Sequence, residues 1–425
     1  MENIKNKNIG TIAFLESLEI RVILLLLILA FAKLIIENKK QPGIRGLVRR
    51  RKEKNLMKKR IVAGMLVSLM AASMVACGGA SDTASTDTSS DTAAAETTED
   101  AGSDDAAASG DLITVGFAQV GHESDWRTAS TNSVQAAFSE ENGYDLQFVD
   151  CDNDSATQIE AVRQFIQDDV DYIVIDPIVS TGWDTVLTEC EDAGIPVIVI
   201  DRTIDDSDKY VSWVGSEFMN EGLAAGTWLK DYAEAKGISD LNILVIEGSN
   251  GSSAQIGRTD GFKKIADAEG WTILDSQDGD FTQDGGQQVM ESYCKSYEGK
   301  FNVVVCQNDN EAFGAMDAMK AAGVSYGVDK DVILISFDAC KAGLEYVESG
   351  DINADFMCYP LQGEYCADIV QQLESGATVA KQTFMTEPWY VAEDILSSIT
   401  YTNNAGEEVT EDLVVVTDAA SQASY

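Results

Sequence analysis

Short apolar runs recur between residues 112 and 425, and most of them end abruptly in polar residues. The clearest example is the run 195–203 (IPVIVIDRT), in which β-branched residues stop at Asp201 and Arg202. Its consecutive apolar residues leave no polar face for a surface helix, so the run predicts a strand buried on both faces of a parallel sheet. Such burial requires helices on both sides. We therefore expect an α/β sheet whose strands all end at one edge.

The alternation of strand and helix occurs in two series. The first predicts strands at 113–120, 145–150, 172–176, 197–201 and 210–214, with helices near 128–140, 155–167 and 184–193. After a helix over 216–235, the second predicts strands at 242–247, 272–276, 303–306, 332–337 and 354–359, again with helices between them. A last strand is expected over 383–391. The pattern predicts two similar α/β lobes with parallel, doubly wound sheets.

Residues 57–76 have the parts of a bacterial export signal. Basic residues 58–60 precede an apolar stretch over 61–70, and the sequence MVAC that ends at Cys77 resembles a lipobox. We expect 57–76 to be a lipoprotein signal peptide. Acylated Cys77 would then anchor the protein to the outer face of the cell membrane.

Two further segments flank this signal. An apolar stretch over 22–32 is short for a bilayer span of about 20 residues. We interpret 1–56 as a misassigned leader, with Met57 as the true start. Residues 78–110 contain no aromatic and no basic residue, a composition that cannot offset its ordering entropy. We expect 77–110 to be the lipidated cysteine and a disordered acidic tether.

Charge and composition narrow the function. The chain has a formal net charge of −41, and the residues from Cys77 onward hold 15 basic and 66 acidic residues, a net charge of −51. Such a surface repels phosphate backbones, which argues against nucleic acid as a partner and favours a neutral ligand, although solubility alone also explains it. The chain has one histidine, His122, and no CxxC pair. We therefore expect no metal, no cofactor, no essential disulfide and no classical hydrolase chemistry.

Arginine placement gives the strongest sign of a binding site. Only four arginines follow Cys77, and Arg127, Arg202 and Arg258 lie in or just after loops at the predicted strand ends, whereas Arg163 falls in a helix. Each could simply pair locally. Together with Asp acceptors, however, their rigid forks of donors suit vicinal hydroxyl groups. We expect them in a solvated cleft at the sheet edge.

Aromatic residues near these loops complete what a sugar requires, because its C–H faces pack against rings while its hydroxyls donate and accept. The candidates are Trp126, Trp183 and Phe281. Either tryptophan could instead be an ordinary core residue, and His122 is better explained as a solvated loop residue.

Several motifs resemble the ribose- and galactofuranose-binding branch of the type I periplasmic sugar-binding proteins. They are VGFAQVGHESDWR (115–127), TGW (181–183), Asp201-Arg202, GDFT (279–282) and Asn308-Asp309, and the resemblance covers about 112–374. It implies two Rossmann-like lobes joined by a three-crossover hinge, closing on a pentose or hexose, in furanose form in some members, for an ABC permease. The implied sugar contacts are Ser124, Trp126, Arg127, Asp201, Arg202, Arg258, Phe281, Asn308 and Asp338, with Glu123, Trp183 and Asp309 as additional candidates.

The resemblance also sets the expected domains. The first lobe is 111–215 plus about 360–388, and the second is 216–359 plus about 389–425. Cys358 departs from the family pattern, since ribose binders carry Gln there, so ribose itself is not the expected ligand. We expect a monomer.

Two other functions stay open. A sugar-sensing module would dock on a chemoreceptor or sensor kinase instead of a permease. A glycosidase would use Asp201 and Asp338 as its carboxylate pair. The second is disfavoured, because carboxylates beside Arg and Asn are expected to stay ionised as acceptors and provide no proton donor.

Overall fold

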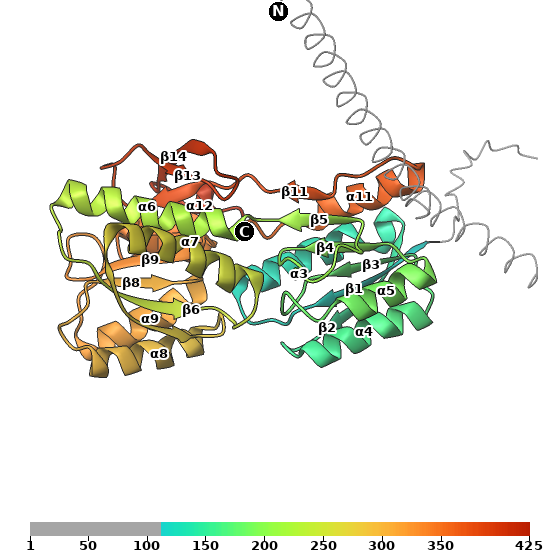
Figure 1. Ribbon diagram of the computed structural model, residues 1–425, viewed down its shortest axis with the longest axis horizontal. Helices are drawn as coiled ribbons and strands as arrows, with labels where there is room; N and C mark the ends of the chain where they lie inside the picture. Colours follow the sequence, from blue (N-terminus) through green and yellow to red (C-terminus); the bar gives the residue numbers. More distant parts are fainter. Residues whose placement is uncertain (1–111) are drawn as a thin grey trace, which may run out of the picture. The chain divides into compact units, whose positions relative to one another are not determined.

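The computed structural model describes residues 112–425 (Figure 1). The expected leader, the signal peptide, Cys77 and the tether all lie outside the described residues. Within 112–425, none of the helices combines the length and the apolar character that crossing a bilayer requires.

The first sheet is parallel throughout, in the order β11-β5-β4-β3-β1-β2. Its strands are β1 (Ile113–Gln119), β2 (Tyr144–Asp150), β3 (Tyr172–Ile175), β4 (Val197–Ile200), β5 (Ser212–Gly215) and β11 (Gln382–Phe384). Its helices are α3 (Asp125–Ala137), the 3-10 turn η1 (Glu140–Asn142), α4 (Ser155–Gln167), α5 (Asp184–Ala193) and α11 (Gly363–Ser375). The strand β4 predicted from the run 195–203 is fully buried, as its composition requires.

The second sheet has the order β13-β14-β12-β10-β9-β8-β6-β7. Its strands are β6 (Asn242–Glu247), β7 (Thr272–Asp278), β8 (Val303–Cys306), β9 (Ile333–Asp338), β10 (Ala354–Met357), β12 (Trp389–Val391), β13 (Ser398–Thr402) and β14 (Glu408–Val415). Its helices are α6 (Phe218–Lys236), α7 (Ser253–Glu269), α8 (Gln283–Ser296), α9 (Asp309–Ala322), α10 (Lys341–Ser349) and α12 (Ala419–Gln422). The pairs β10–β12 and β13–β14 are antiparallel, and the other pairs are parallel.

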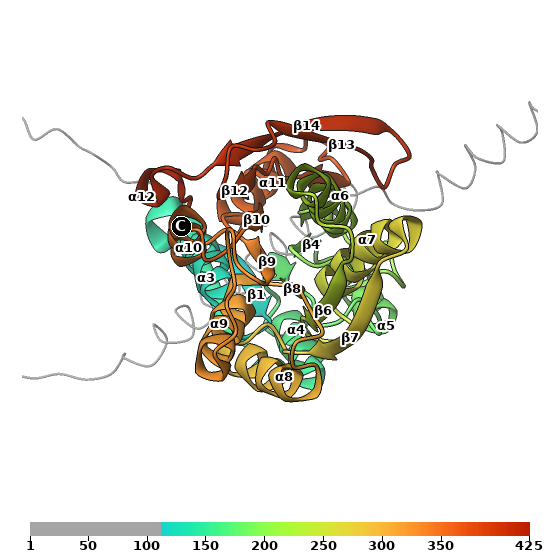
Figure 2. The same ribbon diagram turned by 90° about the vertical axis from the view of Figure 1, so that its left-hand side faces the viewer.

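Alternation along the strands builds a core on each face of the second sheet. Ile243 and Val245 pack with α6 and α7, while their neighbours Leu244 and Ile246 pack with α8 and α9. Figure 2 shows these two helix pairs on opposite sides of the sheet. In the first sheet, alternate residues of β3 and β4 pack against α4 and α5 in the same way.

The chain passes between the sheets three times. The crossovers follow β5, join β10 to α11, and join β11 to β12. The predicted class, two Rossmann-like lobes with parallel sheets and three crossovers, is therefore confirmed. The single strand predicted over 383–391 is wrong, because β11 pairs in the first sheet and β12 in the second, with the third crossover between them.

Candidate functional site

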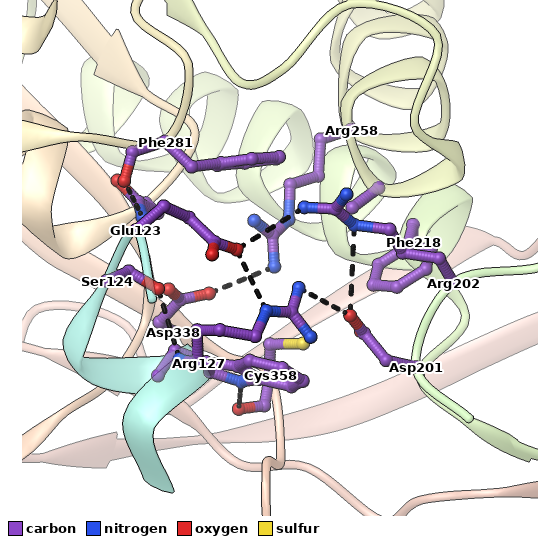
Figure 3. Close-up of a pocket in the computed structure, with 13 residues that line it drawn as sticks. Glu123, Ser124, Arg127, Asp201, Arg202, Phe218, Arg258, Phe281, Asp338 and Cys358 are labelled. Atoms are coloured by element: carbon purple, nitrogen blue, oxygen red, sulfur yellow. Dashed lines mark hydrogen bonds and ion pairs between the residues drawn. The ribbon is translucent and has the colours of Figure 1, made fainter. Parts of the chain in front are cut away.

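A small pocket lies where strands of both sheets end (Figure 3). Its walls come from the loop after β1, the end of β4, the loops after β5 to β8, the end of β9 and the second crossover. The lining residues are Glu123, Ser124, Trp126, Arg127, Asp201, Arg202, Phe218, Ala254, Arg258, Phe281, Asn308, Asp338 and Cys358.

Arg127 organises the wall formed by the first lobe. Ser124 caps α3, its hydroxyl accepting from the Arg127 backbone N–H at 3.1 Å, and this places Arg127 in the first turn of the helix. The guanidinium donates to Glu123 at 2.8 Å, to Asp201 at 3.0 Å and to Asp176. Three carboxylates around one cation leave the guanidinium fixed in direction.

Arg202 lies beside this network and has a hydrogen-bond donor that no protein acceptor uses. Its Nη1 donates to the Ile178 carbonyl at 3.1 Å, while Nε has no hydrogen-bond partner although it is buried. Glu123 Oε2 is likewise buried without a partner. Buried polar atoms are rarely left unpaired, so this donor and this acceptor are natural contacts for a ligand hydroxyl. Asp201 has a left-handed backbone with φ +55°, a strained conformation typical of functional sites.

Arg258 is the corresponding residue of the second lobe. Its guanidinium donates to Glu221 at 2.6 Å, to Asp338 at 3.2 Å and to the Gln307 carbonyl. The side chain is 3% exposed, and Asp338 is buried as well. The expectation of a solvated cleft is thus wrong for these groups, because the two lobes cover them.

Aromatic rings close the pocket around the guanidinium groups. Phe281 lies 5.4 Å from Arg202 and 6.0 Å from Arg258, measured from ring centroid to Cζ. Trp126 donates from Nε1 to the Cys358 carbonyl at 2.8 Å, which holds its ring beside Arg127. Cation–π contact thus accompanies hydrogen bonding on both sides of the pocket.

Burial and neighbouring cations together shift the pKa values of the buried carboxyls in and beside the pocket. Burial raises the pKa of Asp338 well above its ordinary value, although Arg258 opposes the shift. The net pKa of Glu123 is lowered. Burial acts to raise it, but the positive charges of Arg127 and Arg202 outweigh this effect. The pKa of Asp176 is raised by burial in spite of Arg127. For Asp338, burial therefore opposes the expected ionised state, while Arg258 favours it.

Asn308 caps α9 at the pocket. Its Oδ1 accepts from the Glu311 N–H at 2.8 Å and its Nδ2 donates to the Phe281 carbonyl at 2.9 Å. Because both ends of its amide are used within the protein, Asn308 also fixes the strained backbone of Phe281, which has φ +57°. The N-termini of α3 and α9 thus both face the pocket.

Direct contacts join the two lobes around the pocket. The backbone N–H of Asp125 donates to Asn310 at 3.1 Å, and that of Thr203 donates to Ser253 at 2.8 Å. Asn153 donates to Asp280 at 3.1 Å. Several of these residues are sequence neighbours of lining residues, so the hydrogen bonds join the lobes next to the pocket.

The structure brings all nine principal candidates and Glu123 into the lining of one pocket. Two additional candidates lie elsewhere. Trp183 is buried in the first-lobe core, with its Nε1 donating to the Val179 carbonyl at 2.8 Å. Asp309 is not among the lining residues and instead accepts from Ser336 and from the Cys340 backbone at 2.6 and 2.8 Å.

Sequence reasoning missed Phe218 and Ala254. Each stands near the start of a helix, α6 or α7, and looks like an ordinary core residue. A usable signal was their position just after a predicted strand end, where the chain turns toward the cleft.

The model of the periplasmic binding protein domain matches residues 115–378, more than half of the chain. The chain belongs to the periplasmic binding protein family. The galactofuranose-binding protein YtfQ of Escherichia coli (strain K12) is 36% identical over 280 residues, which cover 65% of this chain and 86% of that protein. The fructose import binding protein FruE of Bifidobacterium longum (strain NCC 2705) is 30% identical over 66% of this chain and 85% of that protein.

Solved structures agree with this assignment. A Mycobacterium smegmatis protein in complex with β-D-fucofuranose is 39% identical, with a TM-score of 0.63, over 67% of this chain and 93% of that chain. The arabinose-binding component of an ABC transporter from Shewanella sp. ANA-3, bound to L-arabinofuranose, is 36% identical, with a TM-score of 0.62, over 66% of this chain and 93% of that chain. YtfQ, FruE and the Shewanella protein are binding proteins and not enzymes, which removes the glycosidase alternative.

Proposed function

We propose that this protein captures a monosaccharide in its furanose form outside the cytoplasm and delivers it to an ABC permease. The observation that carries the proposal is the pocket in which three buried guanidinium groups, Arg127, Arg202 and Arg258, meet carboxylates and aromatic rings (Figure 3). A sugar of five or six carbons offers hydroxyls to both kinds of polar group and C–H faces to the rings.

The arrangement of the pocket supports a neutral and compact ligand. Each guanidinium already has at least one carboxylate partner, so an anionic ligand would have to compete with Asp201, Asp338 or Glu123. A hydroxyl group avoids that competition, because it donates to a carboxylate and accepts from a guanidinium at once.

The names of the relatives support the furanose form. YtfQ binds galactofuranose, and the two solved relatives described above hold fucofuranose and arabinofuranose. Their identities to this chain, 36 to 39%, exceed the 29% of the ribose import binding protein of Bacillus subtilis (strain 168). Cys358 lines the pocket at the position where ribose binders resembling this chain carry Gln, which favours a ligand other than ribose.

Delivery to a permease and attachment through Cys77 complete the proposal. The family acts outside the cytoplasm, and the signal and lipobox over 57–77 supply the means of export and anchoring. A lipid anchor keeps a binding protein next to its permease. The acidic stretch 78–110 then acts as a tether between the membrane and the folded lobes.

Calorimetry with D-galactose, L-arabinose, D-fucose and D-ribose tests the sugar assignment. We expect tight binding of at least one of the first three and weaker binding of ribose, and NMR of the bound sugar should show a five-membered ring. Arg258→Lys should weaken binding, whereas Arg163→Lys should not, because Arg163 pairs with Glu189 outside the pocket. Absence of binding to every sugar would overturn the proposal.

A second experiment separates import from sensing. Deleting the gene should abolish uptake of the radiolabelled sugar in the native host if the protein serves a permease. Normal uptake combined with lost transcriptional response would instead establish the sensory role.

A further inference from the structure

Tyr425 lies against the sugar pocket, although it belongs to neither the matched family region nor the pocket lining. Its ring packs against the hydrophobic cluster of Trp126, Phe218, Ala254, Phe281 and Cys358, which are all pocket residues. Its hydroxyl donates to the Asp338 carbonyl at 3.0 Å. The Tyr425 side chain thus contacts both the apolar wall of the pocket and the backbone of Asp338, a polar residue of the pocket lining.

The segment before Tyr425 is held firmly by the second lobe. The backbone N–H of Ala419 donates to Glu348 of α10 at 3.1 Å, and Tyr390 of β12 donates to the Gln422 carbonyl at 3.1 Å. The Lys341 N–H donates to the Tyr425 carbonyl at 3.2 Å. Figure 2 shows the C-terminus beside α10. The phenol is therefore presented to Asp338 from a fixed support.

Asp338 needs such support. Its φ of +100° is unusual for any residue with a side chain, and Ala339 follows with φ +52°. Strained conformations persist where the surroundings determine them. Two contacts do so here: Tyr425 holds the carbonyl of Asp338, and Asp355 accepts from the Ala339 N–H at 3.1 Å. Burial raises the pKa of Tyr425 well above its ordinary value, so the phenol keeps its proton and remains a donor.

Tyr425 also stands where the lobes meet. A groove beside it is lined by Asp125, Thr128 and Asn132 of α3 from the first lobe and by Ser424 and Tyr425 from the second. The cluster against which the Tyr425 ring packs includes Trp126 of α3, so separation of the lobes would take away part of that packing surface. The ring therefore packs best when the pocket is covered.

We propose that Tyr425 is a positioning residue for sugar binding, fixing the Asp338 carboxylate toward the ligand and stabilising the covered pocket. The inference rests on the proposed sugar-binding function. Because Tyr425 acts through Asp338 and through lobe contact, its loss should appear mainly as faster sugar dissociation.

The test compares Tyr425→Phe with Tyr293→Phe, using D-galactose as the probe and, if wild-type protein prefers it, L-arabinose. Tyr293 is a matched control, because its hydroxyl also donates to a carbonyl, that of Val245, but within the second-lobe core. Loss of one hydrogen bond corresponds to about a threefold to tenfold effect. We expect Tyr425→Phe to raise the sugar Kd by that factor through the dissociation rate, and Tyr293→Phe to lower thermal stability with an unchanged Kd.

A double-mutant cycle makes the result specific. In an Asp338→Asn background, assayed at high sugar concentration, the added effect of Tyr425→Phe on Kd should shrink to within twofold. An unchanged Kd in Tyr425→Phe, or a full effect that persists beside Asp338→Asn, would overturn the positioning role while leaving sugar binding intact. If wild-type protein binds none of the four sugars tested above, the proposed function and this inference fall together.

Discussion

Arg202 of the first lobe holds its guanidinium 5.4 Å from the ring centroid of Phe281, a residue of the second lobe. The same ring lies within 6.0 Å of Arg258. Phe281 therefore joins the cationic groups of both lobes across the pocket. Gly248 leaves the space that the ring occupies, since a Cβ there would come within 1.9 Å of it.

Phe281→Leu should weaken sugar binding while the protein stays folded. Leucine keeps an apolar side chain but loses the π face, and cation–π contacts of about 0.5–2 kcal/mol correspond to about 2- to 30-fold in Kd. Calorimetry checks the change. Phe313→Leu is the control, because Phe313 packs with Tyr346 and is not among the pocket residues. Equal Kd values for Phe281→Leu and wild type would contradict the bridging role.

Arg258→Ala should lower stability as well as affinity. The substitution leaves Glu221 and Asp338 buried without their cation, and breaking a buried pair in this way costs about 3–5 kcal/mol. Urea unfolding without sugar measures that cost, and calorimetry measures the affinity. The matched variant Arg163→Ala removes a half-exposed pair and should cost less than about 1 kcal/mol. Comparable unfolding free energies for the two variants would show that the buried ion pairs of Arg258 do not stabilise the fold.

Stability should fall as pH rises because of Glu387 in the third crossover. This carboxyl accepts from Ser216 at 2.5 Å and from the Tyr359 N–H at 2.7 Å, and burial followed by the nearby Glu221 raises its pKa well above the ordinary value. The folded protein therefore retains a proton that the unfolded chain releases near pH 4.3. The stabilisation that comes from this retained proton is complete below about pH 4.3. It is lost as pH rises through the pKa of Glu387 in the folded protein.

Glu387→Gln isolates this effect, because the amide keeps an acceptor oxygen but does not ionise. Unfolding free energies measured from pH 5 to 9 should decrease less steeply in the variant, with the difference approaching about 1.4 kcal/mol per pH unit at most. Parallel curves for the variant and wild type would show that Glu387 does not titrate in this range.

Sugar binding should bring the lobes together. Asp201 and Arg202 belong to the first lobe and Arg258 and Asp338 to the second, so one small ligand meets all of them only when the lobes touch. Without a ligand, the facing carboxylates repel and polar groups lose water, so we expect the lobes to separate. Small-angle scattering should show a smaller radius of gyration at saturating sugar. An unchanged radius would argue against hinge closure but not against binding.

Cys77→Ser should release the protein from the membrane. Two lipid signals already give stable attachment, and a lipobox cysteine carries three acyl chains in the expected processing. Fractionation of native cells and immunoblotting measure the distribution. Retention of the variant in the membrane fraction after a high-salt wash would place the anchor upstream of Cys77.

The sequence by itself determined the fold class and most of the pocket. Runs such as 197–200 are apolar throughout, which fits only a strand covered on both faces, and the polar residues after such strands gather at one sheet edge. Arg127, Arg202 and Arg258 were recognisable because arginine is scarce after Cys77 and these three follow strand ends.

Only the tertiary structure decided what depends on contacts between distant segments. It divided 382–391 between two sheets, since local β propensity does not state which sheet a strand joins. It separated Trp126 of the pocket from Trp183 of the core. It also placed Tyr425 against Asp338 across 87 residues of sequence, a relationship set by packing that no local pattern encodes.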